Sequence, residues 1–203
     1  MEYPVIKKII IYSVFVLFIG LFRVASGAGA DTDHSIPKTS EDENNINLDS
    51  ELKKIDILIK MGFENADIYY NRGWLHAEKG EYDLAKKDYS YALKLDNTHA
   101  DAYFNRGLIY LKEKKYIKAI SDFSQAIKYK PKMSDAFCNR GNAYLQIGKS
   151  RKALEDYNKA IELNGDDPDL YHNRAFINQA LGLTKEADAD FAKAKELRDK
   201  VEK

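Results

Sequence analysis

The sequence predicts an all-α solenoid in which antiparallel helix pairs repeat along the chain. One five-residue motif, an aromatic residue followed by a variable residue, Asn, Arg and a small residue, occurs four times at intervals of 34 residues. Its copies are residues 69–73, 103–107, 137–141 and 171–175. A fixed period of this length is typical of stacked supersecondary units that bury their apolar faces against one another. Small residues at constant offsets also indicate helices that approach each other closely.

The composition suits a soluble protein and excludes several classes of partner. The 203 residues are 44% hydrophobic and 12% aromatic, which suffices for an ordinary core. The formal net charge is zero, and residues 53–203 carry only a small excess of basic residues. Phosphate binding requires a basic stripe, so we expect no nucleic-acid partner. Cys138 is the single cysteine, which excludes an intrachain disulfide and a cysteine-based metal site.

Residues 1–30 are predicted to be an export signal. Lys7 and Lys8 precede an apolar run at residues 9–22, and the small residues at 28–30 fit a cleavage site. The run is shorter than the roughly 20 residues that span a bilayer. We therefore expect an exported protein, periplasmic or secreted. The alternative is a membrane anchor that is not cleaved, and we expect membrane contact only through this segment.

Two segments are predicted between the signal and the repeats. Residues 31–48 are acidic and poor in large apolar groups, which predicts a disordered linker. Residues 49–65 are predicted to form a capping helix that covers the open end of the first repeat. Asp49 or Ser50 would begin this helix. Its apolar residues recur at steps of three and four: Leu52, Ile55, Leu58 and Ile59.

Four repeats follow, at residues 66–99, 100–133, 134–167 and 168–203. Counted from the first residue of each repeat, positions 8, 20 and 27 are small and positions 4 and 24 are aromatic. In the second repeat these residues are Gly107, Ala119, Ala126, Tyr103 and Phe123. Small residues let two antiparallel helices approach, and the aromatic rings fill the space between them.

This pattern resembles the tetratricopeptide repeat family, which has aromatic residues at positions 4 and 24 and small residues at 8, 20 and 27. The resemblance implies a right-handed superhelix of helix pairs. The last repeat has Ala175 where the others have glycine, and it ends in charged residues. Either its second helix is its own cap or a partner covers it. Exposed Leu181, Leu183 and Leu197 near this end would favour self-association.

Every repeat has an arginine at position 7 and an aspartate at position 23. The constant offset predicts a salt bridge between the two helices of each repeat, because a planar guanidinium suits bidentate pairing with a carboxylate. The predicted pairs are Arg72–Asp88, Arg106–Asp122, Arg140–Asp156 and Arg174–Asp190.

The resemblance also implies that the first helix of each repeat lines an inner groove that faces a ligand. Position 6 is always asparagine, whose amide offers a donor and an acceptor to a peptide backbone. Position 2 is always aspartate, which would favour basic or hydroxyl-bearing ligand side chains. The alternative is that the asparagines only bridge neighbouring helices. The candidate groove residues are Asp67, Tyr70, Asn71, Trp74, Asp101, Phe104, Asn105, Leu108, Asp135, Asn139, Asp169, His172, Asn173 and Phe176.

No catalytic residue, metal ligand or cofactor is expected. Cys138 and His172 share position 5 of neighbouring repeats, but no third residue that would orient a nucleophile and a base is evident. The other histidines lack metal-ligand spacing, and the sequence contains no glycine-rich phosphate loop. We predict a non-catalytic protein–protein interaction module, an adaptor or assembly factor that binds an extended peptide or protein segment. The alternative is a membrane-tethered spacer or self-associating scaffold that uses its convex face or its C-terminal end.

Overall fold

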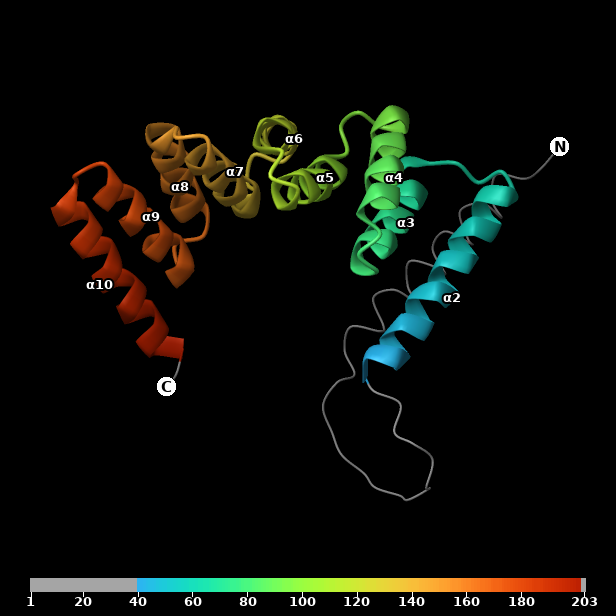
Figure 1. Cartoon of the computed structure of the whole chain (residues 1–203), viewed down its shortest axis with the longest axis horizontal. Helices are drawn as coiled ribbons and strands as arrows, with labels where there is room; N and C mark the ends of the chain where they lie inside the picture. The colour runs from blue at the N-terminus through green and yellow to red at the C-terminus, as the bar shows by residue number, and fades with distance from the viewer. Residues whose placement is uncertain (1–39, 202–203) are drawn as a thin grey trace, which may run out of the picture. The chain divides into compact units, whose positions relative to one another are not determined.

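The computed structural model describes residues 40–201, which belong to one compact unit. The predicted signal at residues 1–30 lies outside this range, as does the predicted linker up to residue 39. The described residues form helices and turns without any strand, so the predicted all-α fold is confirmed (Figure 1). None of the helices within residues 40–201 combines the length and the apolar character needed to cross a bilayer.

Helix α2 (Ser40–Lys60) is followed by four helix pairs. The pairs are α3 (Ala66–Glu78) with α4 (Tyr82–Leu95), α5 (Ala100–Lys112) with α6 (Tyr116–Tyr129), α7 (Ser134–Gln146) with α8 (Ser150–Leu163), and α9 (Pro168–Ala180) with α10 (Thr184–Val201). Each first helix packs against its own second helix, and each second helix packs against the first helix of the next pair. This pattern of neighbour contacts defines a solenoid (Figure 1).

The core of each pair joins a small residue to a large ring. Phe123 on α6 is fully buried, and a Cβ atom added at Gly107 on α5 would lie 2.8 Å from its Cε1 atom. Gly73 and Gly141 are equally close to Tyr89 and Tyr157 in their own repeats. In repeats 1 to 3, glycine therefore suits position 8 because the ring occupies the space of a side chain.

Helix α2 differs from its predicted bounds at both ends. It begins at Ser40, inside the predicted linker, and ends at Lys60 instead of residue 65. The helix ends because Gly62 adopts a left-handed conformation, with φ of +82°, and the Phe63 N–H donates to the Leu58 carbonyl at 3.0 Å.

Helix α2 packs on the first repeat through an apolar cluster. Leu52 and Ile55 are buried against Leu75 of α3, and Ile68 and Trp74 pack around them. This contact covers the side of α3 that faces away from the second repeat.

The leucines near the C-terminal end are less exposed than expected. Leu197 is buried, and Leu181 packs against the core of repeats 3 and 4. Leu183 is the one member of this set that remains exposed. The expectation that all three are free is therefore wrong, because the fold of α10 back onto α9 brings two of them into the interior.

We predict that Gly107→Ala destabilises the fold. Alanine in a helix interior is ordinarily favoured over glycine by about 1 kcal/mol. Here the added methyl group meets the buried Phe123 ring, and overpacking of this kind costs about 1–3 kcal/mol. Urea unfolding followed by circular dichroism should therefore show a lower free energy of unfolding. In a Phe123→Leu background the same change should stabilise the protein, and a stabilised Gly107→Ala single variant would contradict the packing.

Candidate functional site

The four predicted arginine–aspartate pairs form with bidentate geometry. Arg106 Nε donates to Asp122 Oδ2 at 2.8 Å, and its Nη2 donates to Asp122 Oδ1 at 2.8 Å. The aspartate is only 5% exposed. The other three pairs repeat this geometry: Arg72–Asp88, Arg140–Asp156 and Arg174–Asp190. The prediction of a salt bridge between the two helices of each repeat is confirmed.

Each arginine also reaches the second helix of the preceding repeat, a contact that the sequence analysis did not anticipate. Arg106 Nη1 donates to Ser90 Oγ at 2.9 Å, and Arg140 Nη1 donates to Ser124 Oγ at 3.0 Å. The acceptor for Arg174 is Asn158 Oδ1, at 2.8 Å. In every case the acceptor residue precedes the arginine by 16 residues. One guanidinium therefore connects three helices.

Helix α2 takes part in the same arrangement. Arg72 Nη1 donates to Asp56 Oδ1 at 2.9 Å, again across 16 residues. Asp56 thus occupies the place that Ser90 and Ser124 hold in the following repeats. Helix α2 therefore contacts the first repeat as the second helix of a preceding repeat would.

Aromatic rings surround the arginines on the first helices. The Cζ atom of Arg140 lies 5.6 Å from the centroid of Phe137 and 6.0 Å from that of Tyr144. Its hydrogen bond to Asp156 raises the pKa of the guanidinium, so Arg140 stays charged at any physiological pH. All three guanidinium nitrogens of Arg140 donate to side chains of neighbouring helices, so the pair is a structural element.

The candidate groove residues lie on one surface, which we call the ladder face. It consists of these candidate residues, which occupy positions 2, 5, 6 and 9 of the first helices α3, α5, α7 and α9. Its exposed members are Asp67, Asp135, Asp169 and Phe176. Its partly buried members are Tyr70, Asn71, Trp74, Asp101, Phe104, Asn105, Leu108, Asn139, His172 and Asn173.

Two asparagines of the ladder face use their amino groups within the protein. Asn105 Nδ2 donates to Tyr70 Oη at 3.0 Å, and Asn139 Nδ2 donates to the Asp135 carbonyl of its own helix at 2.8 Å. Burial raises the pKa of Tyr157, and the amide of Asn173 partly opposes that rise. The alternative of a bridge between neighbouring helices therefore accounts for the amino group of Asn105.

The amide oxygens are a different case. Within residues 40–201, no donor is bonded to the side-chain oxygen of a ladder asparagine: Asn71, Asn105, Asn139 or Asn173. In this part of the chain, the one buried side-chain oxygen or nitrogen without a hydrogen-bond partner is Glu113 Oε2, so the unbonded asparagine oxygens are not buried. They are therefore accessible acceptors.

The aspartate row is not uniformly negative, contrary to the simple expectation. Asp101 pairs with Lys130 at 2.5 Å, and Asp169 pairs with Arg198 at 2.9 Å. Both cations stand at position 31 of their own repeat, where the third repeat has Asn164. In repeat 1, Asp67 Oδ1 instead lies 3.3 Å from the ring of His99. For Asp135 the described residues provide no ion-pair partner.

The predicted apolar anchors divide into core residues and one exposed ring. Trp74 packs against α2, while Phe104 and Leu108 pack around Phe123 in the core of repeat 2. Phe176 is 53% exposed.

The ring of Phe176 belongs to an aromatic cluster on repeat 4. Its centroid lies 4.9 Å from that of His172 and 5.4 Å from that of Phe191. The His172 and Phe191 rings are 5.6 Å apart, with edge-to-face geometry throughout. The cluster holds Phe176 in place with about half of its surface open to solvent.

Cys138 and His172 do not form a nucleophile and base pair. Cys138 Sγ lies 3.6 Å from Tyr157 Oη, whereas the His172 ring contacts Phe176 and Phe191. Burial raises the pKa of the Cys138 thiol, which keeps it protonated and weakly nucleophilic.

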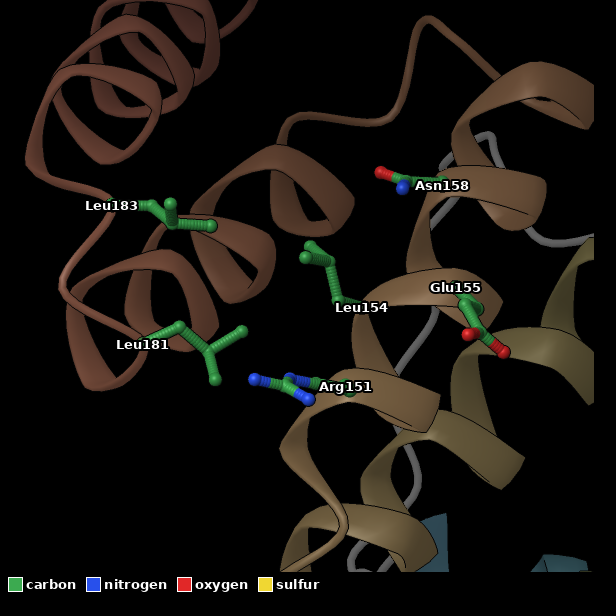
Figure 2. A pocket seen from close by; sticks show the side chains of 6 residues that line it. All are labelled: Arg151, Leu154, Glu155, Asn158, Leu181 and Leu183. Carbon is green, nitrogen blue, oxygen red and sulfur yellow. The ribbon is translucent and has the colours of Figure 1, made fainter.

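A pocket outside the ladder face was missed by the sequence analysis. Leu154 and Arg151 extend from α8 toward Leu181 and Leu183 at the turn between α9 and α10, and the pocket has a volume of about 410 Å³ (Figure 2). Between repeats 1 and 2, Lys86 and Glu113 occupy the positions equivalent to Leu154 and Leu181, and they form an ion pair. The replacement of this charged pair by two leucines was the sequence signal that could have revealed the pocket.

Models of the tetratricopeptide repeat match most of the repeat region. They match residues 100–133, 134–167 and 168–200, and a TPR repeat model matches residues 75–114. The chain belongs to the tetratricopeptide repeat family. No match was found among curated protein sequences.

Solved structures of other repeat proteins have the same fold. A crystal structure of MamA is 24% identical, covers 81% of this chain and 98% of that chain, and superposes with a TM-score of 0.72. MamA from Desulfovibrio magneticus RS-1 is 23% identical, with coverage of 78% and 89% and a TM-score of 0.71. YrrB, described as a TPR protein with an unusual peptide-binding site, is 26% identical, with coverage of 70% and 74% and a TM-score of 0.66.

We predict that Arg106→Met destabilises this tetratricopeptide repeat protein. The variant leaves the buried Asp122 without a partner, and breaking a buried pair in this way costs about 3 kcal/mol or more. Chemical unfolding measures this loss directly. The matched control is Arg198→Met, because the Arg198–Asp169 pair is exposed and surface pairs contribute less than about 1 kcal/mol. Equal effects of the two substitutions would contradict a special role for the buried pair.

Proposed function

We propose that the chain is a non-catalytic interaction module, an adaptor or assembly factor, whose ladder face binds an extended peptide or protein segment. The accessible amide oxygens of the four ladder asparagines carry the proposal. Equivalent acceptors recur once per repeat on a face where the repeats are otherwise well packed. An extended segment presents backbone N–H groups at regular intervals, which is the partner that a row of carbonyl acceptors requires.

The structural similarity to YrrB supports a peptide as the class of ligand. YrrB is described as having a peptide-binding site, and its fold matches that of this chain. The ladder face supplies polar groups for the backbone and apolar or aromatic groups for side chains, which is the usual composition of a binding site.

The competing class, a self-associating scaffold, receives less support at the C-terminal end. In repeats 2 and 3, positions 21 and 28 are apolar and face the next repeat: Ile120, Ile127, Leu154 and Ile161. In repeat 4 these positions are Asp188 and Lys195. A further copy stacked on α10 would therefore bury two charged side chains without an apolar contact in return.

The location of the module follows from the segment outside the described residues. We propose that the chain is exported, and that residues 1–30 are its only contact with a membrane, either before cleavage or as an anchor. This proposal is supported by the order of that segment, in which two lysines precede an apolar run and a stretch of small residues. The ladder face would then meet its partner on the far side of that membrane.

We predict that the double variant Asn105→Ala with Asn139→Ala binds peptides more weakly than the wild type. Peptides would first be selected on the wild-type chain from a display library of random 12-residue sequences. Loss of two hydrogen bonds, each contributing about 1 kcal/mol, corresponds to a loss of affinity of about tenfold or more. Isothermal titration calorimetry with the selected peptides measures this loss.

The control is Asn97→Ala, which removes an exposed amide from a turn outside the ladder face. Thermal unfolding of both variants verifies that Asn105→Ala does not act through its bond to Tyr70. Unchanged affinity in a folded double variant would rule out the asparagine ladder as the binding element.

A further inference from the structure

The two halves of the ladder face differ in how many of their polar side chains are hydrogen-bonded or ion-paired within the protein. In repeats 1 and 2, the Tyr70 ring lies 4.7 Å from that of His99 and its hydroxyl accepts from Asn105. The imidazole of His99 lies 3.3 Å from Asp67, and Asp101 is paired with Lys130. A ligand that bound here would first have to displace these contacts.

Repeats 3 and 4 leave comparable groups open. Asp135 is exposed and has no ion-pair partner within residues 40–201, because Asn164 replaces the cation that serves Asp101 and Asp169. Phe176 presents about half of its surface, supported from behind by His172 and Phe191. Exposed aromatic rings of this kind are typical of binding hot spots.

The open groups belong to one surface around Cys138. Asp135 and Cys138 lie three residues apart on α7, so they belong to the same face of that helix. Burial is the main cause that raises the pKa of the Cys138 thiol, and the negative charges of Asp135, Asp167 and Asp169 raise it further. Cys138 and His172 share position 5 of adjacent repeats, and Phe176 follows His172 by one turn of α9.

Of the carboxylates around this surface, Asp169 is compensated by Arg198, and the side chain of Asp167 accepts from the Asp169 N–H at 2.9 Å. Asp135 has neither kind of partner among the described residues. A ligand carboxylate would be repelled by the Asp135 carboxylate, whereas a cation would gain an ion pair.

We propose that repeats 3 and 4 form the specificity-determining half of the ladder face, and that they select a segment that carries both a lysine or arginine and an apolar or aromatic residue. Asp135 pairs with the basic side chain, and Phe176 with His172 receives the apolar one. This inference rests on the proposed function, since it assigns the ligand's chemistry to the same face.

The test uses a positional-scanning library of N-acetylated, C-amidated octapeptides, in which one position is fixed in each pool. Binding of each pool to the full chain is measured by fluorescence anisotropy. The wild type should prefer pools with a fixed basic residue and pools with a fixed aromatic residue near it. Asp135→Asn should reduce the preference for the basic residue about fivefold, the effect of an exposed ion pair of about 1 kcal/mol. It should leave the aromatic preference unchanged.

Two further variants separate the parts of the inference. Asp188→Asn, which removes an exposed carboxylate on α10 outside the ladder face, should retain both preferences. Phe176→Ala should lose the aromatic preference, and Phe176→Leu, which keeps the packing against Phe191, should lose it in part. A basic preference that survives Asp135→Asn, or that disappears in Asp188→Asn, would overturn the inference while leaving peptide binding intact. Absence of binding by every pool would instead reject the proposed function itself.

Discussion

The repeats are held in place by an arginine that binds two neighbouring helices at once. Two of its nitrogens pair with a buried aspartate on the second helix of its own repeat, and the third reaches the second helix of the preceding repeat. A buried ion pair is weak evidence for net stability, because desolvation opposes the attraction. Its geometry nevertheless specifies register, since only one stacking offset brings all three acceptors within reach. We regard register as the main contribution of this residue.

The two ends of the solenoid are closed in different ways. At the N-terminal end, α2 supplies both an apolar surface for Leu75 and the acceptor Asp56 for Arg72. It therefore satisfies the first repeat as a preceding repeat would. At the C-terminal end the exposed positions of α10 are charged instead of apolar, so no covering helix is required. On the ladder face, the amide oxygens of the asparagines and the Asp135 carboxylate remain without a partner among residues 40–201.

Periodicity predicted those features that depend on equivalent residues in every repeat. The fit of Gly107 to Phe123 and the pair of Arg106 with Asp122 both follow from constant offsets within one repeat. The extent of α2 could not be predicted, because it is a single copy without a pattern to compare. The pairing of Asp101 with Lys130 was also missed, since position 31 differs in every repeat and its distance from position 2 is known only in three dimensions. The sequence alone therefore could not predict which aspartate lacks an ion-pair partner.

Contact between the ladder asparagines and the ligand can be measured through the side-chain amide signals of these residues. Nuclear magnetic resonance spectra of the nitrogen-15-labelled chain would be recorded during titration with a peptide selected on the wild type. Binding at the ladder face should produce saturable shifts of the Asn139 and Asn173 side-chain signals, while the backbone signals of Leu154 and Leu183 in the separate pocket stay constant. Shifts confined to Leu154 and Leu183, with unchanged asparagine signals, would show that the peptide binds away from the ladder face.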